Sequence, residues 1–249
     1  MSRPPRTHIH GAYYHVTSRG NRRAPIFLDQ RDFFIWLEKL AATAEKHHIR
    51  IYGYCLMPNH YHLLIGTPAA NLSEALHMLN AQYCQHFNKR HGSSGHVIQG
   101  RFHAVLIKSN EQLLEVARYI SLNPVRAGLT TSASDWEWSH HRHFLAPANS
   151  PIWLETDWML SLFNTAESYE AFVHAGIGKP NPLKHYRQIP NPKREQARPL
   201  HEYQQAYPDR NEGMARAFHS TAYTLQEIAE CFGVSTRTVS RALTKYPEV

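Results

Sequence analysis

The chain has 249 residues, 42% of them hydrophobic, and a formal net charge of +7 at neutral pH. That length suffices for one large or two small domains with a substantial core, and the excess of Lys and Arg favours an anionic partner such as nucleic acid over charge kept for solubility alone. The chain has three widely spaced cysteines, Cys55, Cys84 and Cys231, which argues against disulfides and thiolate metal sites. It has no apolar run near the ~18 residues of a membrane span and no apolar signal-peptide core, so we expect a cytoplasmic protein.

The N-terminal segment is basic, because no acidic side chain precedes Asp29. We expect residues 1–12, which are rich in Pro and Arg, to form an arm, residues 13–17 to form a short strand, and the Gly- and Asn-containing segment that follows to form a turn. Cations on such a segment can neutralise phosphates, although an ordinary solvated turn is the alternative. The candidate phosphate contacts are Arg3, Arg6, Arg19, Arg22 and Arg23.

Two histidines one residue apart open an apolar run further along the chain. The apolar spacing before them predicts a helix over residues 29–45 and a strand over 49–56, which a Met-Pro-Asn turn joins to the strand that starts with the histidines. Alternation along that strand places His60 and His62 on one face. Two such imidazoles can bind one divalent cation if a third ligand comes from elsewhere; the alternative is coincidence in a chain with 19 histidines.

The elements that follow lead toward a second candidate site. A helix is expected from Asn71 or Ser73 up to Gly92, and a loop rich in Gly and Ser separates it from a strand over residues 103–108. Arg101 precedes that strand, and its guanidinium is suited to clamping a phosphate. A surface ion pair is an equal alternative for this side chain.

A capping box from Ser109 to Gln112 predicts the start of a helix that carries Tyr119 and Asn123. Four residues apart, these two share one helical face, so a phenol able to attack phosphorus and an amide oxygen able to bind a metal arrive together. Pro124 disfavours a helical conformation at the residue before it, so Asn123 can instead be a cap that ends the helix. For Tyr119 the alternative is a buried core side chain. The alternative third metal ligands are Gln99, Glu111 and Glu115.

His-hydrophobe-His on a strand, followed by Tyr-x-x-x-Asn on a later helix, resembles the pattern of the single-tyrosine HUH nucleases, and in particular of the REP-associated tyrosine transposases. The resemblance runs from about Tyr13 to Gly178. It includes the blocks Ser18–Arg22, Met57–Ile65, Gly100–Phe102 and Arg118–Leu129. It implies that Tyr119 is the nucleophile, that His60, His62 and Asn123 bind the metal, and that the substrate is a short palindromic repeat folded into a hairpin. The DNA contacts expected in this region are Ser18, Arg19, Asn21, Arg22, Arg23, Arg101 and Arg126.

The order strand, helix, strand, strand, helix, strand, helix predicts an α+β fold with a ferredoxin-like βαββαβ core. Helices would cover one face of an antiparallel sheet, and the histidine face of a central strand would look toward the helix with Tyr119. We expect four segments along the chain. They are an HUH nuclease core over 1–130, a helical appendage over 131–178, a Pro-rich basic linker over 179–210 and a small all-α helix-turn-helix domain over 211–249.

The C-terminal segment carries the signals of a helix-turn-helix. Thr224 and Glu227 form a capping box, Gly233 permits a tight turn, and Ser235 caps a second helix. The exposed side of that second helix would face a DNA major groove or, alternatively, a protein. The DNA contacts expected on it are Arg237, Thr238 and Arg241.

Together these patterns predict a metal-dependent enzyme that cleaves and rejoins single-stranded or hairpin DNA through a 5′-phosphotyrosine. Imidazole with an amide oxygen suits Mg²⁺ or Mn²⁺ as the cofactor, although Zn²⁺, Ni²⁺ or Co²⁺ would also bind. One rival is a hairpin-binding regulator with a degenerate nuclease core. Another is a hydrolase in which His60 and His62 activate water while Tyr119 is structural. A monomer and a homodimer are equally open, as is whether Tyr119 acts within its own chain or on a partner's site.

Overall fold

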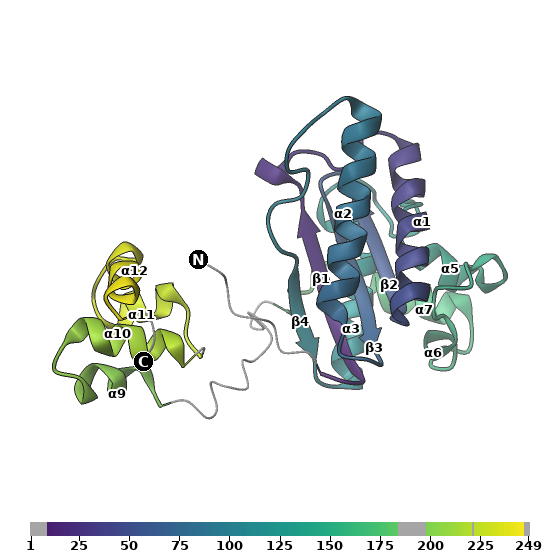
Figure 1. The fold of residues 1–249 in the computed structure, drawn as a ribbon. Helices are drawn as coiled ribbons and strands as arrows, with labels where there is room; N and C mark the ends of the chain where they lie inside the picture. Colours follow the sequence, from purple (N-terminus) through teal and green to yellow (C-terminus); the bar gives the residue numbers. More distant parts are fainter. Residues whose placement is uncertain (1–8, 184–197, 221, 247–249) are drawn as a thin grey trace. The chain divides into compact units, whose positions relative to one another are not determined.

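A sheet of four antiparallel strands forms the centre of the larger unit in the computed structural model, which describes residues 9–183, 198–220 and 222–246 (Figure 1). Alternating side chains give each strand two distinct faces. The strand order is β2-β3-β1-β4, so β1 and β3 are paired on both sides. Their bounds are β1 Ala12–Arg19, β2 Arg50–Met57, β3 His60–Thr67 and β4 His103–Ile107.

Two long helices cover one face of this sheet (Figure 1). α1, Gln30–His47, starts where the carboxylate of Asp29 accepts a hydrogen bond from the backbone N–H of Asp32, and α2, Leu72–His91, ends at Gly92 in the left-handed conformation. The apolar faces of these two helices pack on the strands and form an apolar core with them. Fully buried members of this core include Val16, Trp36, Leu40, Leu63 and Leu79.

A third helix packs on the opposite face. α3, Asn110–Ser121, begins at the predicted cap, where Ser109 Oγ accepts a hydrogen bond from the backbone N–H of Gln112. The side-chain oxygen of Gln112 accepts a hydrogen bond from the backbone N–H of Lys108, whereas in a capping box it would accept one from the N–H of Ser109. The strand order and the placement of α3 confirm the predicted α+β, ferredoxin-like fold with an added helix.

Residues 131–183 contribute to both cores of the larger unit. Phe144, Tyr169 and Val173 pack with α3 in a second core, on the α3 side of the sheet, while Trp138 and Leu154 join the core under α1 and α2. Trp138 stacks on Phe33 with ring centroids 4.5 Å apart, and the indole N–H of Trp136 donates to the backbone O of Leu56 at 2.9 Å. Both tryptophans therefore belong to the core, as expected. The short helices of the larger unit are η1 Asn21–Arg23, α4 Asn123–Arg126, α5 His141–Leu145, η2 Pro147–Asn149, α6 Asp157–Leu160 and α7 Ala166–His174.

The smaller unit contains helices α9 to α12 around a core of its own. The predicted capping box of Thr224 and Glu227 is present, and Gly233 turns the chain between α11 and α12 with a φ of +62°. The linker prediction was wrong for residues 200–206, because they form α9 and bury Tyr203 in this core. The bounds are α9 Leu200–Ala206, α10 Arg210–His219, α11 Leu225–Cys231 and α12 Thr236–Lys245.

Parts of the predictions lie outside the described residues. These are the arm of residues 1–8 with Arg3 and Arg6, and residues 184–197 of the predicted linker. Among the helices that are described, none combines the length and the apolar character needed to cross a bilayer.

Candidate active site

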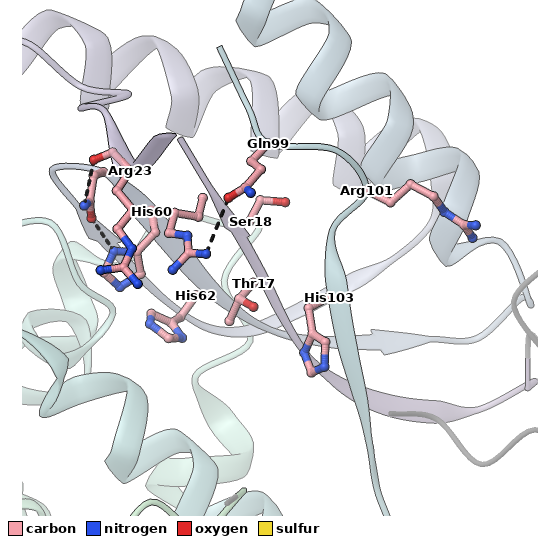
Figure 2. Close-up of a pocket in the computed structure, with 10 residues that line it drawn as sticks. Thr17, Ser18, Arg23, His60, His62, Gln99, Arg101 and His103 are labelled. Atoms are coloured by element: carbon pink, nitrogen blue, oxygen red, sulfur yellow. Dashed lines mark hydrogen bonds between the residues drawn. The ribbon is translucent and has the colours of Figure 1, made fainter. Parts of the chain in front are cut away.

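The two histidines of β3 lie side by side on the face of the sheet that α3 covers. Pairing on both sides of β3 places His62 opposite Thr17 of β1 and Cys55 of β2. The ring centroids of His60 and His62 are 5.0 Å apart. Both rings line one cleft with polar and basic side chains (Figure 2).

A hydrogen bond determines which nitrogen of the His60 ring carries the proton. Nδ1 of His60 lies 2.7 Å from Oδ1 of Asn59, and the amide nitrogen of Asn59 donates to the backbone O of Arg23 at 3.1 Å. Because the second bond identifies the amide oxygen, Nδ1 of His60 must be the donor. Burial, with the nearby charge of Arg19, lowers the pKa of His60. The ring is therefore neutral at pH 7, and its Nε2 keeps a lone pair.

His62 is buried and bonds to a residue that the sequence reasoning missed. Its Nδ1 lies 2.9 Å from Nε2 of His15 on β1, and the two rings stack with centroids 5.1 Å apart. Burial, with neighbouring imidazoles, lowers the pKa of His15 to about 3 and that of His62 well below its usual value. Nε2 of His62 is buried without a hydrogen-bond partner among the described residues. A neutral imidazole with an unpaired nitrogen has the form required of a metal ligand.

The phenol ring of Tyr119 lies across from these imidazoles. Its centroid is 5.9 Å from that of His62 and 6.1 Å from that of His15, with the rings edge to face. α3 buries Val116 and Ile120 in the second core, which holds Tyr119 beside β1 and β3. The structure thus contains the predicted meeting of a late-helix phenol with the histidine pair.

Two polar side chains contact Tyr119. The amide nitrogen of Asn181 donates to the phenol oxygen at 3.3 Å, and the guanidinium of Arg126 lies 5.2 Å from the ring centroid. Arg126 also donates to the backbone O of Lys179 at 2.7 Å. Burial raises the pKa of Tyr119, and the charge of Arg126 opposes that rise. Arg126, expected to contact DNA, thus lies against the phenol, and Asn181 comes from the range predicted as a linker.

Asn123 lies where α3 ends and the short α4 begins. Its amide nitrogen donates to the backbone O of Tyr119 at 2.8 Å, and Pro124 follows as the second residue of α4. α3 ends before the proline, as expected. Asn123 itself is nonetheless helical, because it is the first residue of α4. The hydrogen bond from its side chain to the end of α3 is the capping contact that the sequence offered as the alternative to metal binding.

The other residues considered as a third ligand lie in different surroundings. Gln99 lines the cleft together with His60 and His62. Glu115 pairs with Arg118, and Glu111 accepts a hydrogen bond from Ser109, which lowers the pKa of its carboxyl. No three His, Cys, Asp or Glu side chains gather into a metal site within the part of the chain that is described. Within the described ranges, a third protein ligand to His60 and His62 would therefore be of another type, such as an amide.

The cleft beside the histidines has a volume of about 530 Å³. Arg19 donates to Oε1 of Gln99 across it at 3.4 Å, while Arg101 extends away from the histidines in the view of Figure 2. Ser18 also lines the cleft, although only 5% of it is exposed. The lining residues are Thr17, Ser18, Arg19, Arg23, Asn59, His60, His62, Gln99, Arg101 and His103. Four of the predicted DNA contacts, Ser18, Arg19, Arg23 and Arg101, thus line the cleft that holds the histidine pair.

The basic loop after β1 has an unusual backbone. Arg22 and Arg23 have φ angles of +54° and +63°, in the left-handed region that residues with a Cβ seldom adopt. The loop closes tightly, because a Cβ at Gly20 would lie 2.0 Å from the backbone O of Ala24. Asn21 and both arginines are exposed on it.

α12, the second helix of the predicted helix-turn-helix, presents its predicted DNA contacts on the outer side. Arg237 and Arg241 are exposed, and Thr238 is half-buried with its backbone N–H donating to Ser235 Oγ at 3.2 Å. The opposite side of α12 is buried in the core of this unit through Val239, Ala242 and Leu243.

Comparison with known proteins adds three findings. The family model for IS200-like transposases matches residues 8–123, a stretch that holds His60, His62, Tyr119 and Asn123. A protein of Haemophilus influenzae named as a REP-associated tyrosine transposase is 30% identical over an alignment of 124 residues, and the match covers 45% of this chain and 70% of that protein. A solved structure of a REP-associated tyrosine transposase bound to a REP hairpin covers 62% of this chain and 92% of its own, with a TM-score of 0.51 and 23% identity.

Proposed function

We propose, from the premise that this chain belongs to the REP-associated tyrosine transposases, that it cleaves and rejoins single-stranded DNA with Tyr119 as the nucleophile. The chain is accordingly a DNA transposase. The observation that carries the proposal is the phenol ring of Tyr119, whose centroid lies 5.9 Å from that of the His62 ring.

The proposed reaction exchanges one phosphodiester for another. The phenol of Tyr119 releases its proton to solvent as its oxygen forms a bond to phosphorus, the bond from phosphorus to the 3′ oxygen breaks, and the leaving 3′ oxygen takes up a proton from solvent, so no net proton is gained or lost. The product is a 5′-phosphotyrosine with a free 3′ hydroxyl. Because bonds of the same kind are made and broken, the step is near energy balance and can be reversed to join a strand.

The chain also has residues that fit a divalent cation. The unpaired buried Nε2 of His62 and the Nε2 lone pair of neutral His60 are the two donors that support such a site. We propose Oδ1 of Asn123 as the third ligand, with Gln99 as the alternative that shares the cleft, and Mg²⁺ or Mn²⁺ as the ion. When bound, such a cation would stabilise negative charge on the scissile phosphate.

Activation of Tyr119 falls to the residues around it. A buried phenol resists losing its proton, so the reaction needs groups that favour the phenolate. The charge of Arg126 and the N–H of Asn181 both favour the phenolate, because each stabilises its negative charge.

DNA binding is proposed for two separate surfaces. In the larger unit, Arg19, Arg22, Arg23, Arg101, Asn21 and Ser18 would hold the backbone of an unpaired strand in the cleft, with Arg3 and Arg6 as further contacts outside the described residues. A relative with a solved structure is bound to a REP hairpin, and we propose a hairpin-forming repeat as the substrate here as well. In the smaller unit, Arg237, Thr238 and Arg241 would contact duplex DNA from α12.

The test is to incubate the protein with end-labelled single-stranded hairpin DNA and Mn²⁺ and to look for a covalent adduct on a denaturing gel. The wild-type chain is expected to form the adduct, and Tyr119→Phe to lose it by at least about 10³-fold. Tyr13→Phe is the matched control, because it removes a second half-buried phenol that packs against the same core, from strand β1. Cleavage without an adduct would instead support the hydrolase, and binding alone would support the regulator with a degenerate core.

A further inference from the structure

His15 of β1 makes the contact from which the inference is drawn. It is 4% exposed, and pairing of β1 with β3 and β4 places it opposite Leu64 and Val105. Its Nε2 meets Nδ1 of His62 at 2.9 Å, with the two rings only 13° from parallel. Because β1 is held on both sides, the sheet fixes the face on which this ring lies, and the bond to His62 orients the ring there.

We infer that His15 is a positioning residue that accepts a hydrogen bond from Nδ1–H of His62 and so reserves Nε2 of His62 for a divalent cation. This rests on the proposed function, because it assumes that His62 is a ligand. His15 would not touch the cation or the DNA; it would fix the tautomer and the direction of a ring that does.

Counting protons supports this direction of the bond. Two neutral imidazoles sharing one hydrogen bond have two arrangements, with the shared proton on either ring. If His15 were the donor, His62 would carry its own proton on Nε2, a buried position where no described residue accepts it. A buried donor without an acceptor costs roughly 1–3 kcal/mol. With His62 as the donor, the same nitrogen instead offers a lone pair.

The neighbouring histidine uses the same device, which is an independent observation. Nδ1–H of His60 donates to Oδ1 of Asn59, and Asn59 is itself oriented by its bond to the backbone O of Arg23. Both members of the pair are therefore bonded through Nδ1, one to an amide and one to an imidazole. Metal-binding histidines commonly donate their second ring N–H to such an acceptor, and loss of the acceptor weakens metal binding by about 10- to 100-fold.

A purely structural role would not require an imidazole at this position. Val105 and Leu64 beside it are apolar, and a phenylalanine ring would stack on His62 while filling the same space. A variant that keeps an aromatic ring but loses the hydrogen-bond acceptor can therefore be compared with a variant that keeps an acceptor. The comparison separates a packing role of His15 from a positioning role.

The experiment has two readouts on the full chain. The first is the tautomer of His62 in the cation-free protein at pH 7.5, from two-bond ¹H–¹⁵N correlations, with a proton on Nδ1 expected. The second is Mn²⁺ affinity by calorimetry for the wild type and three variants. His15→Phe should bind about 10- to 100-fold more weakly, while His15→Gln, whose amide oxygen can accept the same bond, should stay within a few fold of wild type. His141→Phe, which removes another buried and hydrogen-bonded imidazole, should bind as the wild type does.

The outcomes separate this inference from the proposed function. A proton on Nε2 of His62, or equal Mn²⁺ affinity in wild type and His15→Phe, would overturn the role of His15 while leaving the nucleophile untouched. A wild-type chain that binds no Mn²⁺ would overturn the proposed metal site, and the inference with it. Should His15→Phe fail to fold, which thermal melting detects, the tautomer and the His15→Gln variant still decide the matter.

Discussion

The two faces of the central sheet differ although the same strands build both. Toward α1 and α2, β1 and β3 present Val16, Tyr61 and Leu63, all fully buried. Toward α3, the alternate residues of these strands include His60 and His62, which border a cleft. A shift of one residue along a strand therefore separates residues that stabilise the fold from residues proposed to act on substrate. Variants of neighbouring residues test whether this division is real.

The sharpest contrast, and the largest expected effect, comes from His62. His62→Gln should lower metal-dependent adduct formation by about 10³-fold, because it removes a proposed ligand, while the melting temperature changes little. Rates of adduct formation and thermal melting measured on the same preparation check this. A variant that keeps near-wild-type adduct formation would remove His62 from the proposed site.

The neighbouring residue should show the opposite behaviour. Leu63→Ala leaves a cavity in the α1 and α2 core and should lower the free energy of unfolding by about 2–5 kcal/mol. Adduct formation per folded molecule should stay as in the wild type. Urea denaturation gives the first quantity, and active-site titration below the transition gives the second. A loss of activity in fully folded Leu63→Ala would show that the two faces are not independent.

Acid should destabilise the α3 side through its buried histidines. Burial lowers the pKa of His140 to about 3 and that of His141 to about 4, whereas the unfolded chain binds these protons near pH 6.5. The stability they support is therefore complete above about pH 6.5 and is lost as the pH falls toward the folded values, by at most about 1.4 kcal/mol per pH unit for each ring.

Urea midpoints at pH 7.5, 6 and 5 measure this loss. His141→Phe should flatten the dependence between pH 7.5 and 5, whereas His96→Gln, at an exposed position, should leave it unchanged. An equal slope in the wild type and in His141→Phe would show that other groups control the acid response.

Arg126 should have a smaller effect, confined to the pH dependence of the reaction. Its guanidinium lies 5.2 Å from the ring centroid of Tyr119 and opposes the rise in the phenol pKa. Arg126→Gln should raise that pKa further and shift the pH–rate profile for adduct formation toward higher pH. The rate near pH 8 should therefore fall by about 3- to 10-fold. Arg50→Gln, an exposed cation that pairs with Glu155, is the control. An unshifted profile would contradict the electrostatic role.

The smallest effect concerns the smaller unit. Arg241→Ala should weaken binding to duplex DNA by a few fold and reduce the slope of log affinity against log salt by about 1, if Arg241 contacts a phosphate. Adduct formation on a short single strand should be unchanged. Filter binding at several salt concentrations tests this, with Gln226→Ala on the exposed side of α11 as the control. No change in the salt slope would favour a protein as the partner of α12.

Local sequence signals predicted much of this architecture. The caps at Asp29 and Ser109, and the terminating Gly92, are short-range features, and the structure has each at the expected helix end. Alternation along the histidine strand similarly put His60 and His62 on one face.

The residues that sequence reasoning missed depend on contacts between distant segments. His15 became a candidate only once the pairing of β1 with β3 brought it to His62, 47 residues away in sequence. Asn181 reaches Tyr119 over 62 residues, from a range whose prolines suggested a linker. The same prolines hid α9, whose buried Tyr203 depends on α10 and α11 for its surroundings. No local pattern encodes such partners.

The left-handed backbone at Arg22 and Arg23 has a consequence for how this protein could change. A residue with a Cβ is held there at a disadvantage of roughly 1–2 kcal/mol relative to glycine, which adopts that conformation freely. Replacing Arg22 by glycine is thus expected to raise the free energy of unfolding and, by removing one of the cations proposed to contact DNA, to weaken DNA binding. If Arg22 contacts DNA as proposed, the stability of the free protein and its affinity for DNA oppose each other at this one position of the loop.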